Sequence, residues 1–361
     1  MGGRRRGEAL TGIDRAADAG DLFGRASARL RRAVPFDAAV WAAADPETGL
    51  VTAPMLVEGL GERERCADYW ESELLEENVV PFRDLARAAV PAAGLRAATG
   101  DLPARSARFR RLLEGQGVRD ELRAVFRAGD RSWGVVSLFR TGGGPFTHDE
   151  VELVAGLSTP MATRLRRLAR PAEPSPLPDA PGPGLVLFDP SGAATSLNDE
   201  AREHLASLPP GPSVPTALGV RLPIWIIGTA LQARAIARGR DHGGARVRIR
   251  TAAGRWLVCH ASGLTGPGGS PGPVALVIEP ASAADLAVII AESYELTPRE
   301  LEITQHVARG LPTAEIAARL FISPHTVRDH LKTIFQKTGA SSRGELVARL
   351  FTEHHWPGAR S

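Results

Sequence analysis

The chain has 361 residues, which is too long for one ordinary hydrophobic core and predicts two or three domains. Hydrophobic residues make up 43% and charged residues 24%, a composition typical of soluble globular proteins. The formal net charge is only +3, so bulk charge alone does not indicate a polyanionic partner.

The scarcity of lysine excludes one kind of chemistry and disfavours another. Lys332 and Lys337 are the only lysines, and the other basic side chains, apart from histidine, are arginines. Since no glycine-lysine pair exists, a phosphate-binding loop of the G-x-x-x-x-G-K-[ST] kind is excluded. A catalytic Schiff-base lysine is disfavoured, because both lysines lie in the segment that we assign to DNA below.

The sequence favours a cytoplasmic protein without metal, cofactor or membrane contact. Cys66 and Cys259 lie far apart, which disfavours a disulfide framework and a thiolate metal site. No apolar segment follows the basic run at residues 4–6, so this run does not predict a signal peptide. The longest apolar run, at 224–231, is far too short to span a bilayer.

Residue patterns predict two α+β domains separated by a linker. In residues 12–170, helical spacing covers 22–30, 66–75 and 149–168, and strand-like runs cover 38–43, 121–127 and 133–140. Residues 171–183 contain six prolines, which is typical of an extended linker. In residues 184–281, strands are expected at 184–189, 194–197, 247–250, 256–261 and 274–278, with helices from about 198 and over 224–237.

Four consecutive helix-start signals predict an all-α domain over 292–355. Thr297 and Glu300 form a capping box with proline at the first helical position, and Ser323-Pro324 repeats the order of cap then proline. Ser342 and Glu345 form a further capping box. The second helix is expected over 313–320. Pro312 stands where its cap would lie, so Thr313 is the candidate cap one residue later.

The third of these helices has two different faces. Val327, Leu331, Ile334 and Phe335 fall on one apolar stripe at 100° per residue. The opposite side carries the long polar side chains that could read base edges, namely His325, Arg328, Asp329, Lys332 and Gln336. A short helix, a three-residue turn and a longer helix of this kind form the arrangement that enters a major groove.

Residues at the ends and edges of the helices are candidates for phosphate contacts. Ser323, Thr326, Lys337 and Arg343 supply hydroxyl groups, backbone N–H groups and cations at such places. Double-stranded DNA is therefore the expected partner of this domain.

The segment from Leu296 to Phe351 closely resembles the LuxR/NarL-type helix-turn-helix domain. The matching elements are Leu296-Thr297-x-Arg299-Glu300, Gly310-Leu311, Glu315-Ile316-Ala317, Ile322-Ser323, Thr326-Val327, His330-Leu331, Ile334, Lys337 and Ser342-Arg343. The resemblance implies a four-helix domain whose third helix reads bases through Arg328, Asp329 and Lys332. It also implies a homodimer on a two-fold operator, paired through the last helix at Leu346, Val347 and Leu350.

The preceding parts resemble two families of sensory domains. Pro35-Phe36-Asp37, the strand at 133–138 and Phe146-Thr147-x-Asp149-Glu150 resemble a GAF domain. The segments 187–192 and 198–201 resemble a PAS domain. Both resemblances imply signal sensing or dimerisation, and neither implies a particular ligand.

The expected protein is a non-enzymatic transcriptional regulator switched by a small-molecule effector or a partner. RNA polymerase is a further candidate partner. One alternative function is that of a sigma-factor-like or adaptor protein that uses a related helix-turn-helix to contact polymerase. A sensor enzyme whose helical tail binds protein is a second alternative, but no nucleophile elbow, H-E-x-x-H motif or phosphate loop supports it.

Overall fold

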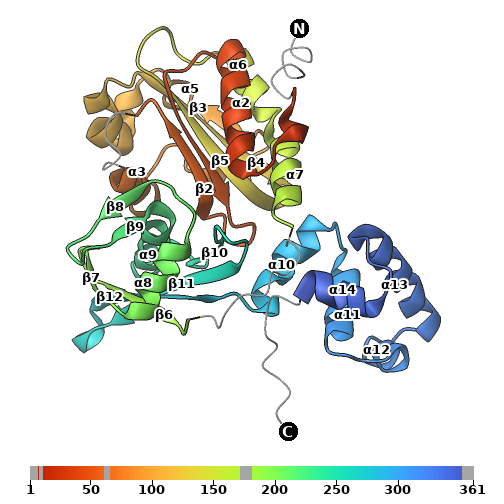
Figure 1. Cartoon of the computed structure of the whole chain (residues 1–361). Helices are drawn as coiled ribbons and strands as arrows, with labels where there is room; N and C mark the ends of the chain where they lie inside the picture. The colour runs from red at the N-terminus through yellow and green to blue at the C-terminus, as the bar shows by residue number, and fades with distance from the viewer. Residues whose placement is uncertain (1–6, 8–10, 61–65, 171–180, 352–361) are drawn as a thin grey trace. The chain divides into compact units, whose positions relative to one another are not determined.

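The computed structural model describes residues 7, 11–60, 66–170 and 181–351. It divides into two compact units (Figure 1). The first unit comprises Met1–Leu165, Pro181–Ala253 and Leu257–Glu279 and contains both sheets. The second comprises Arg166–Ala180, Gly254–Trp256 and Pro280–Ser361, and we call it the helical unit.

The first sheet has five strands in the order β2-β1-β5-β4-β3. Their bounds are β1 Ala38–Ala44, β2 Val51–Glu58, β3 Ala92–Gly94, β4 Asp120–Ala128 and β5 Arg131–Arg140. Every pair of neighbouring strands is antiparallel. The expected hairpin between β4 and β5 is confirmed, with Gly129 in its turn at a φ of 59°.

Two helices cover one face of this sheet. Helix α2 (Ala19–Ala33) brings Phe23 to within 6.1 Å of Trp41 on β1, measured between ring centroids. Helix α7 (Ser158–Leu168) packs Leu165 against Gly134 of β5, where a Cβ atom would lie only 2.9 Å from Leu165 and from the Ala42 carbonyl oxygen. Trp41 is fully buried, as expected from its place on a predicted strand.

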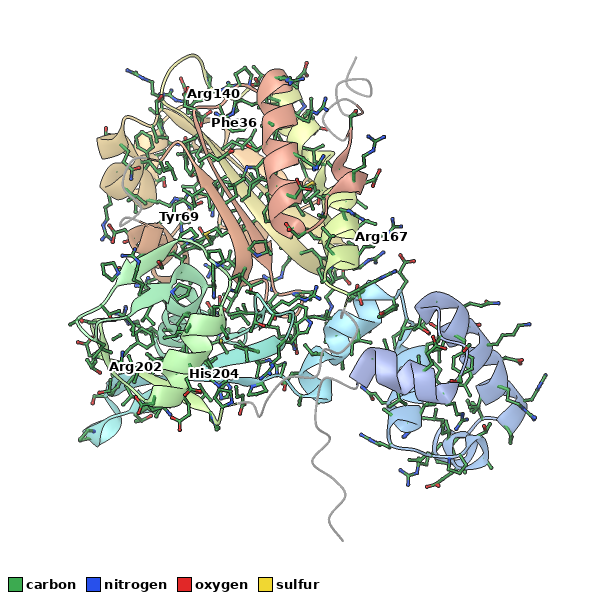
Figure 2. All side chains as sticks on the ribbon, in the orientation of Figure 1. Phe36, Tyr69, Arg140, Arg167, Arg202 and His204 are labelled. Atoms are coloured by element: carbon green, nitrogen blue, oxygen red, sulfur yellow. The ribbon has the colours of Figure 1, made fainter. Side chains whose placement is uncertain are left out.

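A buried ionic cluster occupies the opposite face of the sheet, under α3 (Cys66–Leu75), α4 (Phe82–Leu85) and the short helix Phe109–Leu113. The Glu73 carboxylate on α3 pairs with Arg108 at 3.2 Å and with Arg123 at 2.7 Å. Glu121 pairs with Arg108, and the hydroxyl group of Tyr69 (labelled in Figure 2) lies 2.7 Å from that of Ser137. Each charge therefore has a partner of opposite sign, which buried ions require.

The second sheet repeats the same strand order, as β10-β11-β12-β6-β7. The strands are β6 Gly184–Phe188, β7 Ala194–Leu197, β10 Arg246–Arg250, β11 Trp256–Thr265 and β12 Pro271–Pro280. Asn198 caps α8 (Asp199–Ser207), and α9 (Ile224–Ala237) is almost entirely buried. The hairpin of β8 (Ser213–Pro215) and β9 (Arg221–Pro223) lies between these helices in the chain and was not expected.

The loop that follows β1 is bound to β10 of the second sheet within the first unit. Asp45 accepts the Arg248 backbone N–H at 3.0 Å and pairs with its guanidinium group at 2.8 Å. Glu47 pairs with both Arg246 and Arg248, and the hydroxyl group of Thr48 donates to the Arg246 carbonyl at 2.8 Å. The side chain of Arg248 is 1% exposed and that of Asp45 is 0% exposed, so this contact is fully shielded from water.

Several elements of the first unit differ from those that the sequence predicts. The single helix expected over 149–168 is divided at Gly156 into α6 (His148–Ala155) and α7. Its capping box at Thr147 and Glu150 is confirmed. Strand β2 was missed, because Pro54 interrupts a run that otherwise reads as a strand. The short α5 (Leu95–Thr99) was also missed.

The helical unit contains α10 (Ala283–Ser293), α11 (Pro298–Ala308), α12 (Thr313–Arg319), α13 (Pro324–Thr338) and α14 (Arg343–Phe351). The four helices from α11 onward confirm the predicted four-helix arrangement, whereas α10 was not expected as a separate helix. Among the described residues, no helix is long and apolar enough to cross a bilayer. Most of the expected linker, residues 171–180, lies outside the described residues, as do residues 352–355 of the predicted helical domain.

Candidate nucleic-acid interface

Local sequence signals fix where the two central helices begin. Ser323 caps α13 by accepting the Thr326 backbone N–H at 3.0 Å, and Pro324 takes the first helical position. Pro312 caps α12 without any side-chain hydrogen bond, so the proposed cap at Thr313 is wrong. Thr313 is instead the first residue of the helix.

The apolar stripe of α13 anchors the helix to its own domain. Val327, Leu331 and Ile334 are buried, together with residues of the other three helices: Ile303, Val307, Ile316, Leu346 and Leu350. Phe335 is only partly buried. Burial of this stripe turns the polar side of α13 outward.

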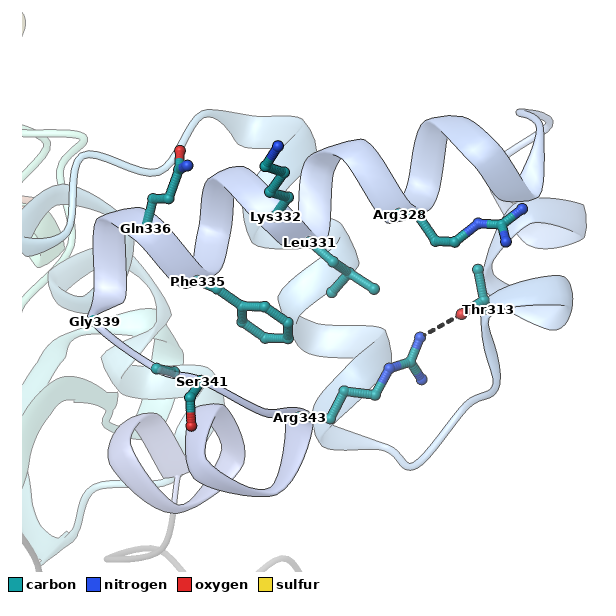
Figure 3. A pocket seen from close by; sticks show the side chains of 10 residues that line it. Thr313, Arg328, Leu331, Lys332, Phe335, Gln336, Gly339, Ser341 and Arg343 are labelled. Carbon is teal, nitrogen blue, oxygen red and sulfur yellow. Dashed lines mark hydrogen bonds between the residues drawn. The ribbon is translucent and has the colours of Figure 1, made fainter.

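All five predicted base-reading residues are exposed: His325, Arg328, Asp329, Lys332 and Gln336. Figure 3 shows the side chains of Lys332 and Gln336 extending from the same side of α13. At the start of the helix, His325 Nε2 lies 3.7 Å from the Asp329 carboxylate, and Arg328 Nε donates to the Pro324 carbonyl at 3.2 Å. The face therefore offers donors and an acceptor from one rigid helix.

A shallow groove of about 670 Å³ runs along one flank of this face (Figure 3). Its polar walls come from Arg328, Lys332 and Gln336 on α13, from Ser341 and Arg343 beside the start of α14, and from Thr313. Leu331 and Phe335 form its apolar floor.

Two of the predicted phosphate-binding residues lie together at the N-terminus of α13. The hydroxyl groups of Ser323 and Thr326 are 2.9 Å apart, and Ser323 is exposed. A helix N-terminus with hydroxyl groups beside it is a favourable place for a phosphate, because its backbone N–H groups point outward.

The other two predicted phosphate-binding residues are held by the protein itself. Lys337 Nζ donates to the Glu300 carboxylate and to the Glu295 carbonyl, at 2.7 and 2.8 Å. Arg343 donates to the Leu311 carbonyl at 2.9 Å and to the Thr313 hydroxyl group at 2.6 Å. These contacts favour a structural role for both cations, and phosphate binding by them stays a prediction.

Glu300 belongs to the predicted capping box and also binds Lys337, a contact that the sequence analysis does not predict. Burial disfavours its charged form, but the hydrogen bonds from Lys337 and from the Thr297 backbone hold the pKa of Glu300 below its ordinary value. The partner, Lys337, lies 37 positions away on another helix, so no spacing within the sequence indicates this contact.

The predicted pairing residues on α14 are largely covered. Leu346 and Leu350 are 0% and 2% exposed because they pack into their own domain. Val347 is partly exposed. A second copy could therefore reach Val347 without disturbing the core, and pairing through α14 stays a prediction.

Known proteins match this part of the chain. The family described as "Bacterial regulatory proteins, luxR family" matches residues 294–350. The spore germination protein GerE of Bacillus subtilis is 42% identical over 55 residues, which are 15% of this chain and 74% of GerE. The chain belongs to the luxR family of bacterial regulatory proteins.

Other relatives share only a small part of their length with this luxR-family chain. An HTH-type transcriptional regulator of Mycobacterium bovis is 46% identical over 52 residues. These residues are 14% of this chain and 6% of that regulator. The crystal structure of Escherichia coli SdiA covers 95% of this chain and 94% of its own, at 12% identity and a TM-score of 0.34. A likeness at that score carries no conclusion about residues 1–293.

Proposed function

We propose that the protein is a transcriptional regulator that binds double-stranded DNA through α13. The exposed polar face of α13, backed by a buried apolar stripe and preceded by α12 and a short turn, is the observation that carries this proposal. In this function His325, Arg328, Asp329, Lys332 and Gln336 read base edges in the major groove. Membership of the luxR family supports the same conclusion.

In the proposed complex, Ser323 and Thr326 hold a phosphate at the N-terminus of α13. The main role of Lys337 and Arg343 is structural, since Lys337 binds α13 to α11 and Arg343 binds α14 to the start of α12. Both cations still add positive charge beside the duplex, and charge near phosphates raises affinity for all sequences alike.

We infer that two copies bind a two-fold operator. One reading helix contacts few bases, and pairing two of them provides the affinity that a regulator needs. Half-sites should then lie about one helical turn, roughly 10 base pairs, apart. Of the three residues predicted to pair the two copies, Val347 on α14 is the one whose side chain is partly exposed.

The sheet-containing unit is proposed to sense a signal through GAF-like and PAS-like domains. The identical order of strands in its two sheets supports the view that both are related domains. Within this unit, a cavity of about 530 Å³ is lined by Trp70 and Phe82 next to the first sheet and by Gln232 on α9. A small-molecule effector could occupy it and contact both domains at once.

Within the helical unit, the end of α7 contacts the segment that supports the reading helix. In the helical unit, Arg166 pairs with Glu295 at 2.7 Å, and Arg170 donates to the Ser293 carbonyl at 3.0 Å. The Glu295 carbonyl accepts from Lys337 at the end of α13. A displacement of Arg166 and Arg170 would therefore act directly on the segment that supports α13.

Selection of duplexes from a random-sequence pool by the full-length protein tests the proposal. We expect enrichment of a site with two inverted half-sites, and footprinting should show protection of both. A pool that yields no enriched duplex would contradict the function. An enriched site without symmetry would leave DNA binding intact and contradict only the dimer.

A further inference from the structure

The residue that follows α12 has an unusual backbone. Phe321 has a φ of 54°, in the left-handed region that side chains rarely adopt. Its N–H donates to the Ala318 carbonyl at 3.3 Å, and the Ile322 N–H donates to the Ala317 carbonyl at 3.0 Å. This pair of bonds is the Schellman motif, whose left-handed position is usually glycine.

Other helix ends of the helical unit show what this position normally requires. Gly310 after α11 and Gly339 after α13 have φ values of 77° and 71°. Glu295 after α10 is the other non-glycine residue described there with a positive φ, at 57°, and its carboxylate pairs with Arg166. At each of these ends the residue is either glycine or has a side chain with a partner.

The side chain of Phe321 has no comparable place in the fold. It is 94% exposed, whereas the other exposed large hydrophobic residues in the described part of the chain reach at most 52%. Because the ring is exposed to water, it adds no hydrophobic stabilisation to the fold. The left-handed backbone of Phe321 also costs stability. Neither the core nor the turn therefore accounts for a phenylalanine here, which points to a contact outside the chain.

The position of Phe321 indicates what that contact is. The residue lies in the turn of the helix-turn-helix, two positions before Ser323, which caps the proposed reading helix. The hydroxyl groups of Ser323 and Thr326 mark the same helix end as a place for a phosphate. A protein partner that bound this ring would compete for the same surface with the duplex that α13 is proposed to bind.

We propose that Phe321 binds the DNA backbone, with its ring against the deoxyribose carbons of the strand that passes the N-terminus of α13. This inference rests on the proposed function. The ring carries no charge and cannot form a strong hydrogen bond, so the contact adds affinity without reading sequence and without releasing counterions.

The test is Phe321→Asn in the full-length protein, because asparagine adopts left-handed backbone more readily than phenylalanine. We expect the melting temperature to rise by a few degrees as the turn relaxes. Affinity should fall on the order of tenfold, equally for a duplex selected from a random pool and for a scrambled duplex of the same length. The dependence of affinity on salt should not change.

Phe321→Leu is the matched control, since it keeps an apolar side chain and the same backbone strain. It should retain more affinity than the asparagine variant and show no rise in melting temperature. Wild-type affinity in Phe321→Asn would overturn the inference and leave a protein partner as the account of the ring. A lower melting temperature in that variant would also overturn it, because the ring would then be part of the fold. If the wild-type protein binds no duplex, the proposed function itself fails.

Discussion

At the scale of single residues, Lys337 connects the end of α13 to α11 and to the residues that follow α10. Its place at the end of a predicted helix suggested a phosphate contact, and that reasoning used only helix ends and charge. Its partners, Glu300 and Glu295, lie 37 and 42 positions away in the chain. Spacing within one helix cannot reveal such contacts, because they depend on how α11 packs on α13.

The pairing of Glu300 with Lys337 predicts a dependence of stability on pH. The pKa of Glu300 in the folded state lies below its ordinary value of 4.5, so the unfolded chain binds a proton more readily. The stabilisation is complete above pH 4.5 and is lost as the pH falls through the folded pKa. Acid unfolding of the helical unit, followed by circular dichroism, should therefore lose part of its pH dependence in Glu300→Gln. Identical acid transitions in variant and wild type would contradict this account.

The exposed residues of α13 could be predicted because they follow a period of 3.6 along one helix. The same rule also found the buried stripe at Val327, Leu331 and Ile334. It could not find Phe321, since a left-handed phenylalanine has no signature in the sequence.

At the scale of elements, helical spacing and capping boxes predicted helices correctly where the pattern was clear, but not where it was continuous or interrupted. Helices α3 and α9 have the bounds that their spacing predicts, and the capping boxes at Thr147 and Thr297 are present. Helix α10 was missed because its apolar residues form one continuous run, which lacks a helical period. The break at Gly156 was not predicted, because the periodic pattern of apolar residues continues across it from α6 to α7.

The contact between the end of α7 and the segment after α10 gives a prediction at this scale. Replacing both Arg166 and Arg170 with Met should speed hydrogen exchange at the Glu295 and Leu296 amides, whose bonds close the end of α10. Arg167, exposed on the same helix (Figure 2), supplies the control variant Arg167→Met. Exchange in α13 near Val327 should not change. Unaltered exchange at Glu295 and Leu296 would show that α7 does not support this segment.

At the scale of the whole molecule, the two sheets of the first unit are joined through buried charge. Asp45 directly follows β1 of the first sheet, Arg248 lies on β10 of the second sheet, and both side chains are almost completely shielded from water. Residue patterns predict two domains in this region, separated by a proline-rich linker, but they carry no sign of a buried ion pair between the two. The positions involved are 203 residues apart.

Removing one partner of this pair should destabilise the first unit strongly. Arg248→Met leaves the Asp45 carboxylate buried without its cation, which should lower the free energy of unfolding by about 3–5 kcal/mol. Arg246→Ala breaks the half-exposed pair with Glu47 and should cost at most about 1 kcal/mol. Urea unfolding of both variants measures the difference. Equal costs would mean that the buried pair does not hold the two sheets together.

The affinity of the full-length protein for duplex DNA, measured over a series of salt concentrations, tests the central claim most directly. We predict that the logarithm of the binding constant falls linearly with the logarithm of salt concentration. Lys332→Ala should weaken binding to the selected duplex by roughly 1–3 kcal/mol and reduce its preference over a scrambled duplex. A folded wild-type protein without salt-sensitive affinity for any duplex would contradict the assignment of α13 to DNA.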